Sequence, residues 1–388
     1  MTNKFSTQKS DTDTHGVIIT LTKYKNYGCV IQRWALQTFL KKNGYEFGSF
    51  VFTPYFSFKR LFRKFVAWNK FHMKNILRPI VRLLNGKRPL FVIYNRHKYA
   101  RTKWLKKFAT QKITQEPFDN SALDKYNTFI VGSDQVWRNW YPEQPSELLR
   151  YFLDYIADPN AKRIAYAASF GKDSIQEAGL AAHSEKISVL LKKFDAISVR
   201  ESSGVNIIKN NWGLDAIQVL DPTLLLSCDD YSALIDAPIC QTNDVKPISY
   251  YVLDATPEIK SLIKRIAEKT GLEYGGIFLN ECRILPPIEQ WLKNFRDCEF
   301  VVTDSFHGTV FSIINRKPFV VIANEWRGTS RMSSLLQTLG LEKRLIDNKK
   351  IASFNLHDLT DIDYEAVYSK LEIFREFSAS WLMTQLKK

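Results

Sequence analysis

The sequence predicts an α/β protein of two Rossmann-like domains that face each other across a cleft. Short apolar strands alternate with helical segments along the 388 residues, and most strands run into a small or polar turn. A chain of this length, 45% hydrophobic, can bury two separate cores. Because open α/β sheets bind ligands at the carboxyl ends of their strands, we expect the polar turns to line the cleft.

The domain division follows from a less regular stretch at about 227–246. Residues 1–14 are predicted as a disordered tail, 15–228 as the first domain, and 229–388 as the second domain with a closing helix at about 364–386. The first domain opens with a strand at 16–21, the loop 22–28 and a helix at 29–42. The remaining predicted strands are 128–131, 163–168, 196–199 and 217–220 in the first domain, and 248–253, 273–278, 300–303 and 319–323 in the second.

The net charge of +15 is concentrated in one segment of the first domain. No acidic residue lies between Glu46 and Glu116, and this interval holds 17 lysines and arginines. Apolar residues recur there at three- and four-residue spacing, which predicts a basic amphipathic helical insertion over about 56–112. Two interpretations stay open: a surface that lies on an anionic membrane, or a helix that packs on its own domain. Nucleic-acid binding is less favoured, because no recognised RNA-binding pattern accompanies the charge.

Cysteine usage and hydropathy favour a cytoplasmic location. The five cysteines form no CxxC pair and have no finger-like spacing to histidine, so we expect neither a zinc site nor a disulfide framework. The N-terminus lacks the apolar core of a signal peptide, and no apolar run approaches the roughly 20 residues that span a bilayer. A dinucleotide fingerprint, a metal-binding Asp-x-Asp setting and a GxSxG elbow are missing from the sequence. We therefore expect no cofactor and no metal.

The strongest candidate site is the segment TDSFHGT at 303–309, where a buried strand runs into an apolar helix. Free N–H groups and the positive end of the helix dipole favour an anion such as phosphate or carboxylate there, which makes Ser305, Gly308 and Thr309 candidate anion-binding residues. His307 is the candidate for proton transfer, because an imidazole titrates near neutrality. The alternative is that the turn merely caps the helix and the histidine is an ordinary buried side chain.

Other strand ends supply charged candidates. Asp134 follows the strand at 128–131 and is the candidate carboxylate partner of the histidine; its alternative role is a turn or helix cap. Arg200, Arg327 and Arg331 are candidate anion clamps, because a guanidinium can engage phosphate or carboxylate with two hydrogen bonds. The alternatives are an ion pair of Arg200 with Glu201 and solvated loop positions for the other two.

Substrate-binding candidates surround these groups. In the first strand-to-helix turn a glycine would let the backbone approach a ligand. Tryptophans that follow the Asp134 turn, Trp137 and Trp140, could stack on a sugar ring or pack in the core. The full set of substrate-binding candidates is Asn26, Gly28, Gln32, Ser133, Trp137 and Glu201.

Six short motifs, taken in order, resemble those of one known family, the polysaccharide pyruvyl transferases. They are NYGCVIQRWALQ at 26–37, VGSDQVW at 131–137, SFG at 169–171, SVRE at 198–201, LDPT at 220–223 and TDSFHGT at 303–309. The resemblance covers about residues 16–345 and implies a fold similar to GT-B glycosyltransferases. It also implies transfer of pyruvate from phosphoenolpyruvate to a hexose as a cyclic ketal, in the biosynthesis of a bacterial capsule, exopolysaccharide or lipid-linked glycan. The basic insertion has no match in the shared pattern of the family.

The sequence therefore predicts a transferase that binds phosphoenolpyruvate between its domains. The expected acceptor is a sugar linked to polyprenyl diphosphate at the inner membrane face, where the basic segment at 56–112 would contact anionic lipid. Two alternatives stay open. A GT-B-type glycosyltransferase would bind a nucleotide sugar in the same place, and a non-enzymatic basic protein would bind nucleic acid through the basic segment.

Overall fold

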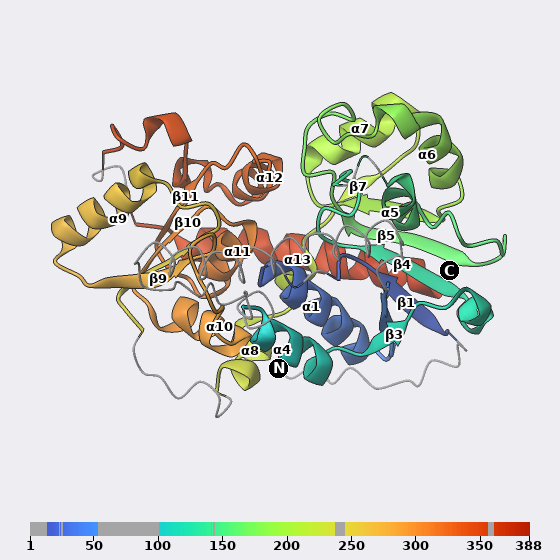
Figure 1. The fold of residues 1–388 in the computed structure, drawn as a ribbon, viewed down its shortest axis with the longest axis horizontal. Coiled ribbons are helices and arrows are strands. Elements are labelled where there is room, and N and C mark those ends of the chain that lie inside the picture. Colours follow the sequence, from blue (N-terminus) through green and yellow to red (C-terminus); the bar gives the residue numbers. More distant parts are fainter. Residues whose placement is uncertain are drawn as a thin grey trace, which may run out of the picture.

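Two parallel sheets organise the chain, as Figure 1 shows for the computed structural model. The structure describes residues 14–52 apart from 23 and 25, residues 101–236 apart from 141 and 143, and residues 245–355 and 361–388. The seven-stranded sheet has the order β3-β2-β1-β4-β5-β6-β7 and the five-stranded sheet the order β12-β11-β10-β8-β9. The predicted α/β fold with two Rossmann-like units is confirmed. The predicted tail up to residue 13 and the basic insertion up to residue 100 lie outside the described residues.

The first sheet and its helices come from the N-terminal half of the chain. In order, its strands and helices are β1 (Gly16–Ile19), α1 (Gly28–Lys42), β2 (Gly48–Val51), α4 (Lys103–Lys112), β3 (Gln115–Pro117), β4 (Thr128–Gly132), α5 (Pro145–Leu149), β5 (Lys162–Ala168), α6 (Ser184–Leu191), β6 (Ala196–Val199), α7 (Ser202–Trp212) and β7 (Ile217–Gln218). Sequence analysis missed β2 and β3, and β7 ends two residues earlier than predicted. α4 shows that the last part of the predicted basic insertion is helical.

The second sheet comes from the C-terminal half. Its elements are α8 (Cys228–Ile235), β8 (Ile248–Val252), α9 (Pro257–Thr270), β9 (Tyr274–Phe278), α10 (Ile288–Asp297), β10 (Phe300–Thr303), α11 (Phe306–Ile314), β11 (Phe319–Ile322), α12 (Ser330–Leu339), β12 (Leu345–Ile346) and α13 (Tyr364–Lys387). α8 occupies part of the stretch expected to be irregular, because Ser227 and Asp230 form a capping box at its N-terminus.

The two halves share a continuous apolar contact. Tyr27, which precedes α1, stacks on Trp291 of α10 with ring centroids 4.8 Å apart, and its hydroxyl donates to the Pro286 carbonyl at 3.0 Å. Both rings belong to one buried cluster that includes side chains of both sheets. A stacked aromatic pair adds about 0.5–1.5 kcal/mol beyond the area it buries, so this contact holds the two halves together.

α13 forms a second connection between the halves. This helix follows the second sheet and runs back along the first (Figure 1). The Ser378 hydroxyl accepts a hydrogen bond from the Leu220 N–H at 3.0 Å, and Arg375 Nε donates to the Leu224 carbonyl at 2.6 Å. These bonds are made next to the carboxyl end of β7, so α13 supports the strand end that carries Asp221. No helix in the described part of the chain is long and apolar enough to cross a membrane.

Candidate functional site

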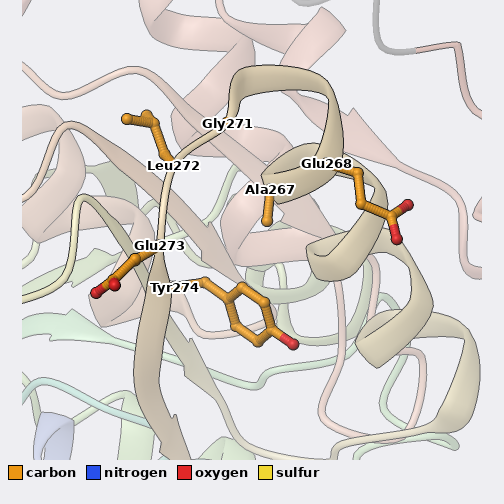
Figure 2. A pocket seen from close by; sticks show the side chains of 6 residues that line it. All are labelled: Ala267, Glu268, Gly271, Leu272, Glu273 and Tyr274. Atoms are coloured by element: carbon orange, nitrogen blue, oxygen red, sulfur yellow. The ribbon is translucent and has the colours of Figure 1, made fainter.

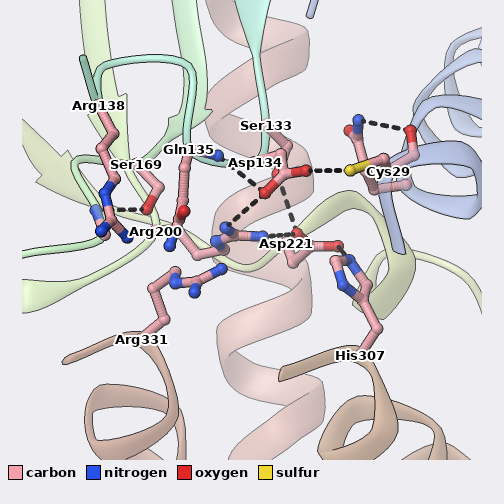
Figure 3. Close-up of polar contacts among 12 residues, drawn as sticks. Cys29, Ser133, Asp134, Gln135, Arg138, Ser169, Arg200, Asp221, His307 and Arg331 are labelled. Atoms are coloured by element: carbon pink, nitrogen blue, oxygen red, sulfur yellow. Dashed lines mark hydrogen bonds and ion pairs between the residues drawn. The ribbon is translucent and has the colours of Figure 1, made fainter. Parts of the chain in front are cut away.

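The carboxyl ends of strands from both sheets meet at one cluster of charged side chains (Figure 3). The first sheet contributes Asp134 after β4, Arg200 after β6 and Asp221 after β7. The second half contributes His307 from the first turn of α11 and Arg331 from the first turn of α12. All five residues are at most 9% exposed. Residues predicted from separate motifs are therefore brought together, across the boundary between the halves.

Asp221 lies at the centre of the cluster. Its Oδ2 accepts from Ser133 Oγ at 2.9 Å and from Arg200 Nη1 at 2.6 Å, and its Oδ1 accepts from the N–H and the hydroxyl of Thr223 at 3.0 and 2.6 Å. Burial alone would raise the pKa of Asp221, but the charges of His307 and Arg200 and these hydrogen bonds outweigh it and hold the pKa well below its ordinary value. The carboxylate is therefore ionised at physiological pH.

His307 lies between the two halves. Its Nε2 is 3.7 Å from Asp221 Oδ1, and this buried nitrogen makes no hydrogen bond to a described residue. Gly28 approaches from the first turn of the N-terminal half: a Cβ added there would lie 2.1 Å from His307 Nδ1. A glycine at position 28 is thus required by the close approach of the imidazole. The histidine is placed to exchange a proton with a group bound beside Asp221.

Asp134 occupies a strained turn at the end of β4. Its backbone has a φ of 66°, in the left-handed region that non-glycine residues rarely adopt. Its carboxylate accepts from Cys29 Sγ at 3.0 Å and from the Gln135 N–H at 2.8 Å, and lies 3.6 Å from Arg200 Nη2. Burial acts to raise the pKa of Asp134, but Arg200 and the other nearby cations lower it below its ordinary value. Asp134 is therefore an ionised hydrogen-bond acceptor rather than a proton donor.

Two arginines supply unused donors to this cluster. Arg200 Nε and Nη2 and Arg331 Nε are buried and make no hydrogen bond to a described residue. Both guanidinium groups lie near the ring of Phe306, 4.5 Å away for Arg200 and 5.8 Å for Arg331. Burial and the neighbouring Arg200 charge lower the pKa of Arg331 to about 10, so both groups remain cationic near neutral pH. Buried polar groups without partners are costly, and a bound anion would satisfy these donors.

Glu201 holds the loop after β5 through one of its carboxylate oxygens. Its Oε1 accepts from Ser169 Oγ at 2.9 Å and from the N–H groups of Phe170 and Gly171 at 2.8 and 3.1 Å. Burial raises the pKa of Glu201, although Arg200 and these hydrogen bonds act in the opposite direction. These bonds fix the loop after β5, while Glu201 Oε2 is buried and makes no hydrogen bond to a described residue; a contact of this residue with substrate stays a prediction.

Two predicted roles differ from the structure. Trp137 is fully buried, stacks on Phe152 at 5.4 Å and donates its Nε1–H to the Tyr151 carbonyl, so it packs in the core and cannot stack on a sugar. Arg327 places its guanidinium on Asp254, with Nε and Nη2 at 2.6 and 3.0 Å from the carboxylate. A paired guanidinium is not a free anion clamp.

The remaining predicted residues have local partners. Ser305 caps α11 by accepting from the Gly308 N–H at 3.3 Å, and Thr309 Oγ1 donates to the Ser305 carbonyl at 3.1 Å. The capping interpretation of this turn therefore holds for the serine, while the histidine two residues later reaches the charged cluster. In the first turn of the chain, Asn26 accepts from the Cys29 N–H at 2.9 Å, and Gln32 donates to Thr20 Oγ1 at 3.1 Å. These side chains support the site without reaching the centre of the cluster.

Three site residues were not predicted. Asp221 was noticed only as part of a motif, because Asp-Pro is an ordinary turn dipeptide, and its partner Ser133 lies 88 residues away in the chain. Cys29 was one of five scattered cysteines, with no signal that its thiol reaches Asp134. Arg138, whose guanidinium lies 4.2 Å from the Trp140 ring, follows the Asp134 turn and lowers the pKa of Arg331 together with Arg200. The sequence signal for Arg138 is its position as a basic residue four positions after the polar strand end at Asp134.

A surface hollow outside the charged cluster lies in the second half of the chain. It has a volume of about 460 Å³ and is lined by the end of α9 and the start of β9, including Glu268, Glu273 and Tyr274 (Figure 2). Its two acidic side chains and lack of any lining cation make it unsuited to an anionic ligand. Within the described ranges, no group of three or more histidine, cysteine, aspartate or glutamate side chains is arranged to hold a metal ion. The charged cluster is therefore the candidate active site.

Two Rossmann-like units with a charged site between their strand ends define a GT-B-like fold. The chain is similar in fold to S. aureus MnaA, solved with UDP, at 10% identity and a TM-score of 0.50 over 96% of both chains. It also matches Arabidopsis thaliana UGT89C1, solved with UDP-L-rhamnose, at 9% identity and a TM-score of 0.49 over 96% of this chain and 98% of that one. No curated protein matches by sequence. The chain belongs to the polysaccharide pyruvyl transferase family, which it matches over residues 26–325.

Proposed function

We propose that this protein transfers pyruvate from phosphoenolpyruvate to two hydroxyl groups of a hexose, forming a cyclic ketal. The observation that carries the proposal is the pair of buried guanidinium groups with unused donors, Arg200 and Arg331, beside His307. Phosphoenolpyruvate presents a phosphate and a carboxylate close together, and two arginines can engage both with charge-assisted hydrogen bonds. Membership of the family supports the reaction type.

The reaction needs a proton transfer and the loss of phosphate. One acceptor hydroxyl forms a bond to C2 of the enolpyruvyl group while C3 receives a proton and becomes a methyl group. The second hydroxyl forms the other C2–O bond as the C2–O bond to phosphate breaks. Of the two hydroxyl protons, one balances the proton delivered to C3 and the other leaves with inorganic phosphate.

The cluster has a group for each of these tasks. His307 delivers the proton to C3 and recovers one from a hydroxyl, because an imidazole nitrogen can both donate and accept a proton and the buried Nε2 makes no hydrogen bond to a described residue. Asp221 orients the imidazole and stabilises its charged form, being 3.7 Å from Nε2. Asp134, ionised at neutral pH, accepts a hydrogen bond from an acceptor hydroxyl. Arg200 and Arg331 hold the donor and stabilise the negative charge that develops on the leaving phosphate.

Thermal unfolding with and without phosphoenolpyruvate tests the donor, with inorganic phosphate, UDP and GDP in parallel. At a ligand concentration of about 100 times Kd, binding stabilises the native state by about 2.7 kcal/mol. Arg331→Met should lose this stabilisation without lowering the stability of the free protein, because removing a buried charge that lacks a carboxylate partner relieves a desolvation cost. Arg283→Met, at an exposed position outside the cluster, is the matched control.

Two outcomes would contradict the proposal. If phosphoenolpyruvate gives no stabilisation while UDP or GDP does, the protein is a glycosyltransferase that uses a nucleotide sugar. If Arg331→Met responds to phosphoenolpyruvate like the wild type, the donor does not bind at the cluster. The lipid-linked acceptor and the membrane surface stay predictions of the sequence, since most of the basic segment lies outside the described residues.

A further inference from the structure

Two exposed tryptophans lie at the edge of the candidate active site. Among the described residues, large apolar side chains are seldom exposed, yet Trp326 is 73% exposed and Trp140 is 38% exposed. They come from different halves of the chain: Trp140 follows the Asp134 turn of the first half, and Trp326 lies in the loop between β11 and α12. Exposed indole rings on both sides of the boundary between the two halves form a surface that can bind a partly apolar ligand.

Arg138 joins the two tryptophans. Its guanidinium lies 4.2 Å from the centroid of the Trp140 ring, while its Nη2 donates to the Trp326 carbonyl at 3.1 Å. The indole Nε1–H of Trp140 donates to the Gln135 carbonyl at 3.3 Å, which fixes the orientation of that ring. The Trp140 ring is thus held in place before a ligand binds, and the backbone that carries Trp326 is bonded to the same arginine, which lowers the cost of ordering this surface on binding.

The same loop connects this surface to the proposed donor site. The Arg327 carbonyl accepts hydrogen bonds from Gln135 Nε2 at 2.8 Å, from Arg138 Nη1 at 3.3 Å and from Arg331 Nη2 at 3.1 Å. A single carbonyl therefore bonds to an arginine of the donor site and to the arginine under Trp140. Trp326 immediately precedes Arg327 in the chain, so the exposed indoles lie next to the arginines of the candidate active site.

We propose that Trp140 and Trp326 form a platform for the pyranose ring of the acceptor, with Arg138 donating to a ring hydroxyl. The faces of a pyranose carry C–H groups that pack on an indole, and its hydroxyls need hydrogen-bond partners at the rim. Arg138 has five N–H donors and uses two in the bonds described above. The role as acceptor site rests on the proposed function, but the binding of a sugar by this surface can be measured separately.

The probes are the methyl glycosides of galactose, glucose and mannose, which have no aromatic group of their own. Saturation-transfer NMR identifies which ring protons contact the protein, and titration gives the dissociation constants. We expect at least one glycoside to bind, and Trp326→Ala to weaken its binding about tenfold. Trp326→Phe, which keeps an aromatic face, should restore most of the affinity. Trp104→Ala, on α4 with its ring covered by Lys103 and Lys107, is the matched control and should bind like the wild type.

Stabilisation by phosphoenolpyruvate is measured on the same variants and separates the two proposals. If Trp326→Ala weakens glycoside binding and keeps the phosphoenolpyruvate response, the platform is supported. If glycosides bind through Trp326 while phosphoenolpyruvate never binds the wild type, the platform stands and the proposed donor is wrong. The platform is overturned if no methyl glycoside binds the wild type, or if Trp326→Ala binds glycosides as tightly as the wild type.

Discussion

Asp221→Asn tests the charge network on which the candidate site depends. The Asp221 side chain is buried, and its carboxylate accepts hydrogen bonds from Arg200, Ser133 and Thr223. The asparagine keeps the shape but has no charge, and its amide nitrogen cannot accept a hydrogen bond. Arg200 is then left in the interior with Asp134 as its nearest carboxylate, at 3.6 Å. Breaking a buried ion pair by removing one partner costs about 3–5 kcal/mol, and we expect a loss in this range.

The pH dependence of this loss follows from the depressed pKa of Asp221. A carboxyl whose pKa is lower in the folded state stabilises the protein above its unfolded pKa of about 3.9, and this contribution is lost as the pH falls toward the folded pKa. The contribution of the Asp221 ionisation to the difference in the free energy of unfolding between wild type and Asp221→Asn should therefore be constant from pH 7 to about pH 5. Below about pH 4 it should narrow by about 1.4 kcal/mol per pH unit.

Urea denaturation at each pH measures these differences, with Asp215→Asn as the matched control. Asp215 also pairs with a cation, Lys209 at 2.9 Å, but both side chains are largely exposed, so its replacement should change stability by less than about 1 kcal/mol. A double-mutant cycle of Asp221→Asn with Arg200→Met should show a coupling of about 1–3 kcal/mol. The reasoning is refuted if Asp221→Asn lowers the free energy of unfolding by no more than Asp215→Asn does. It is also refuted if the effects of Asp221→Asn and Arg200→Met on this free energy are additive.

Three further predictions concern the surroundings of the cluster. Gly28→Ala places a methyl carbon 2.1 Å from His307 Nδ1, so the imidazole must shift by more than an ångström. The rate of phosphate release from phosphoenolpyruvate in the presence of acceptor should therefore fall by about 10²-fold. An unchanged rate would contradict the assigned role of the histidine. Glu201→Gln should gain stability relative to the wild type as the pH rises above the unfolded glutamate pKa of about 4.3, because the raised pKa of Glu201 in the folded protein means that its ionisation opposes folding there. Urea denaturation across this pH range measures the gain, and a wild type that gains on the variant would show the opposite sign. Trp137→Ala should lower the free energy of unfolding by about 3–5 kcal/mol, measured in the same way, and a variant as stable as the wild type would show that the ring is not a core residue.

The strands in the middle of each sheet were predicted at close to their observed positions. The predicted strand at 128–131 is β4, and that at 300–303 is β10, because a strand covered on both faces reads as an uninterrupted apolar run. β2 was missed since it begins with a glycine and a serine, and β3 since Gln115–Pro117 contains no large apolar residue. β3 lies at the edge of its sheet, where backbone pairing forms a strand without an apolar pattern.

The sequence also placed the right residue types at strand ends but could not decide which way each side chain points. Arg200 and Arg331 reach the cluster, whereas Arg327 turns to Asp254, a residue 73 positions earlier in the chain. Trp137 follows a polar turn, but its backbone N–H donates to the Ser169 carbonyl at 3.1 Å. The chain therefore stays close to the first sheet, and the ring enters the core. Such choices depend on contacts between distant segments, which no local pattern records.

The contact between His307 and Asp221 joins the two halves of the chain at the point where chemistry is proposed. The imidazole belongs to α11 of the second half, and the carboxylate follows β7 of the first. A rotation of one half against the other would take the histidine away from its carboxylate and also expose the arginines to water, where their attraction for an anion is weaker. The protein would then be inactive whenever it is open, and in the proposed reaction the donor would meet His307 only after solvent has been excluded.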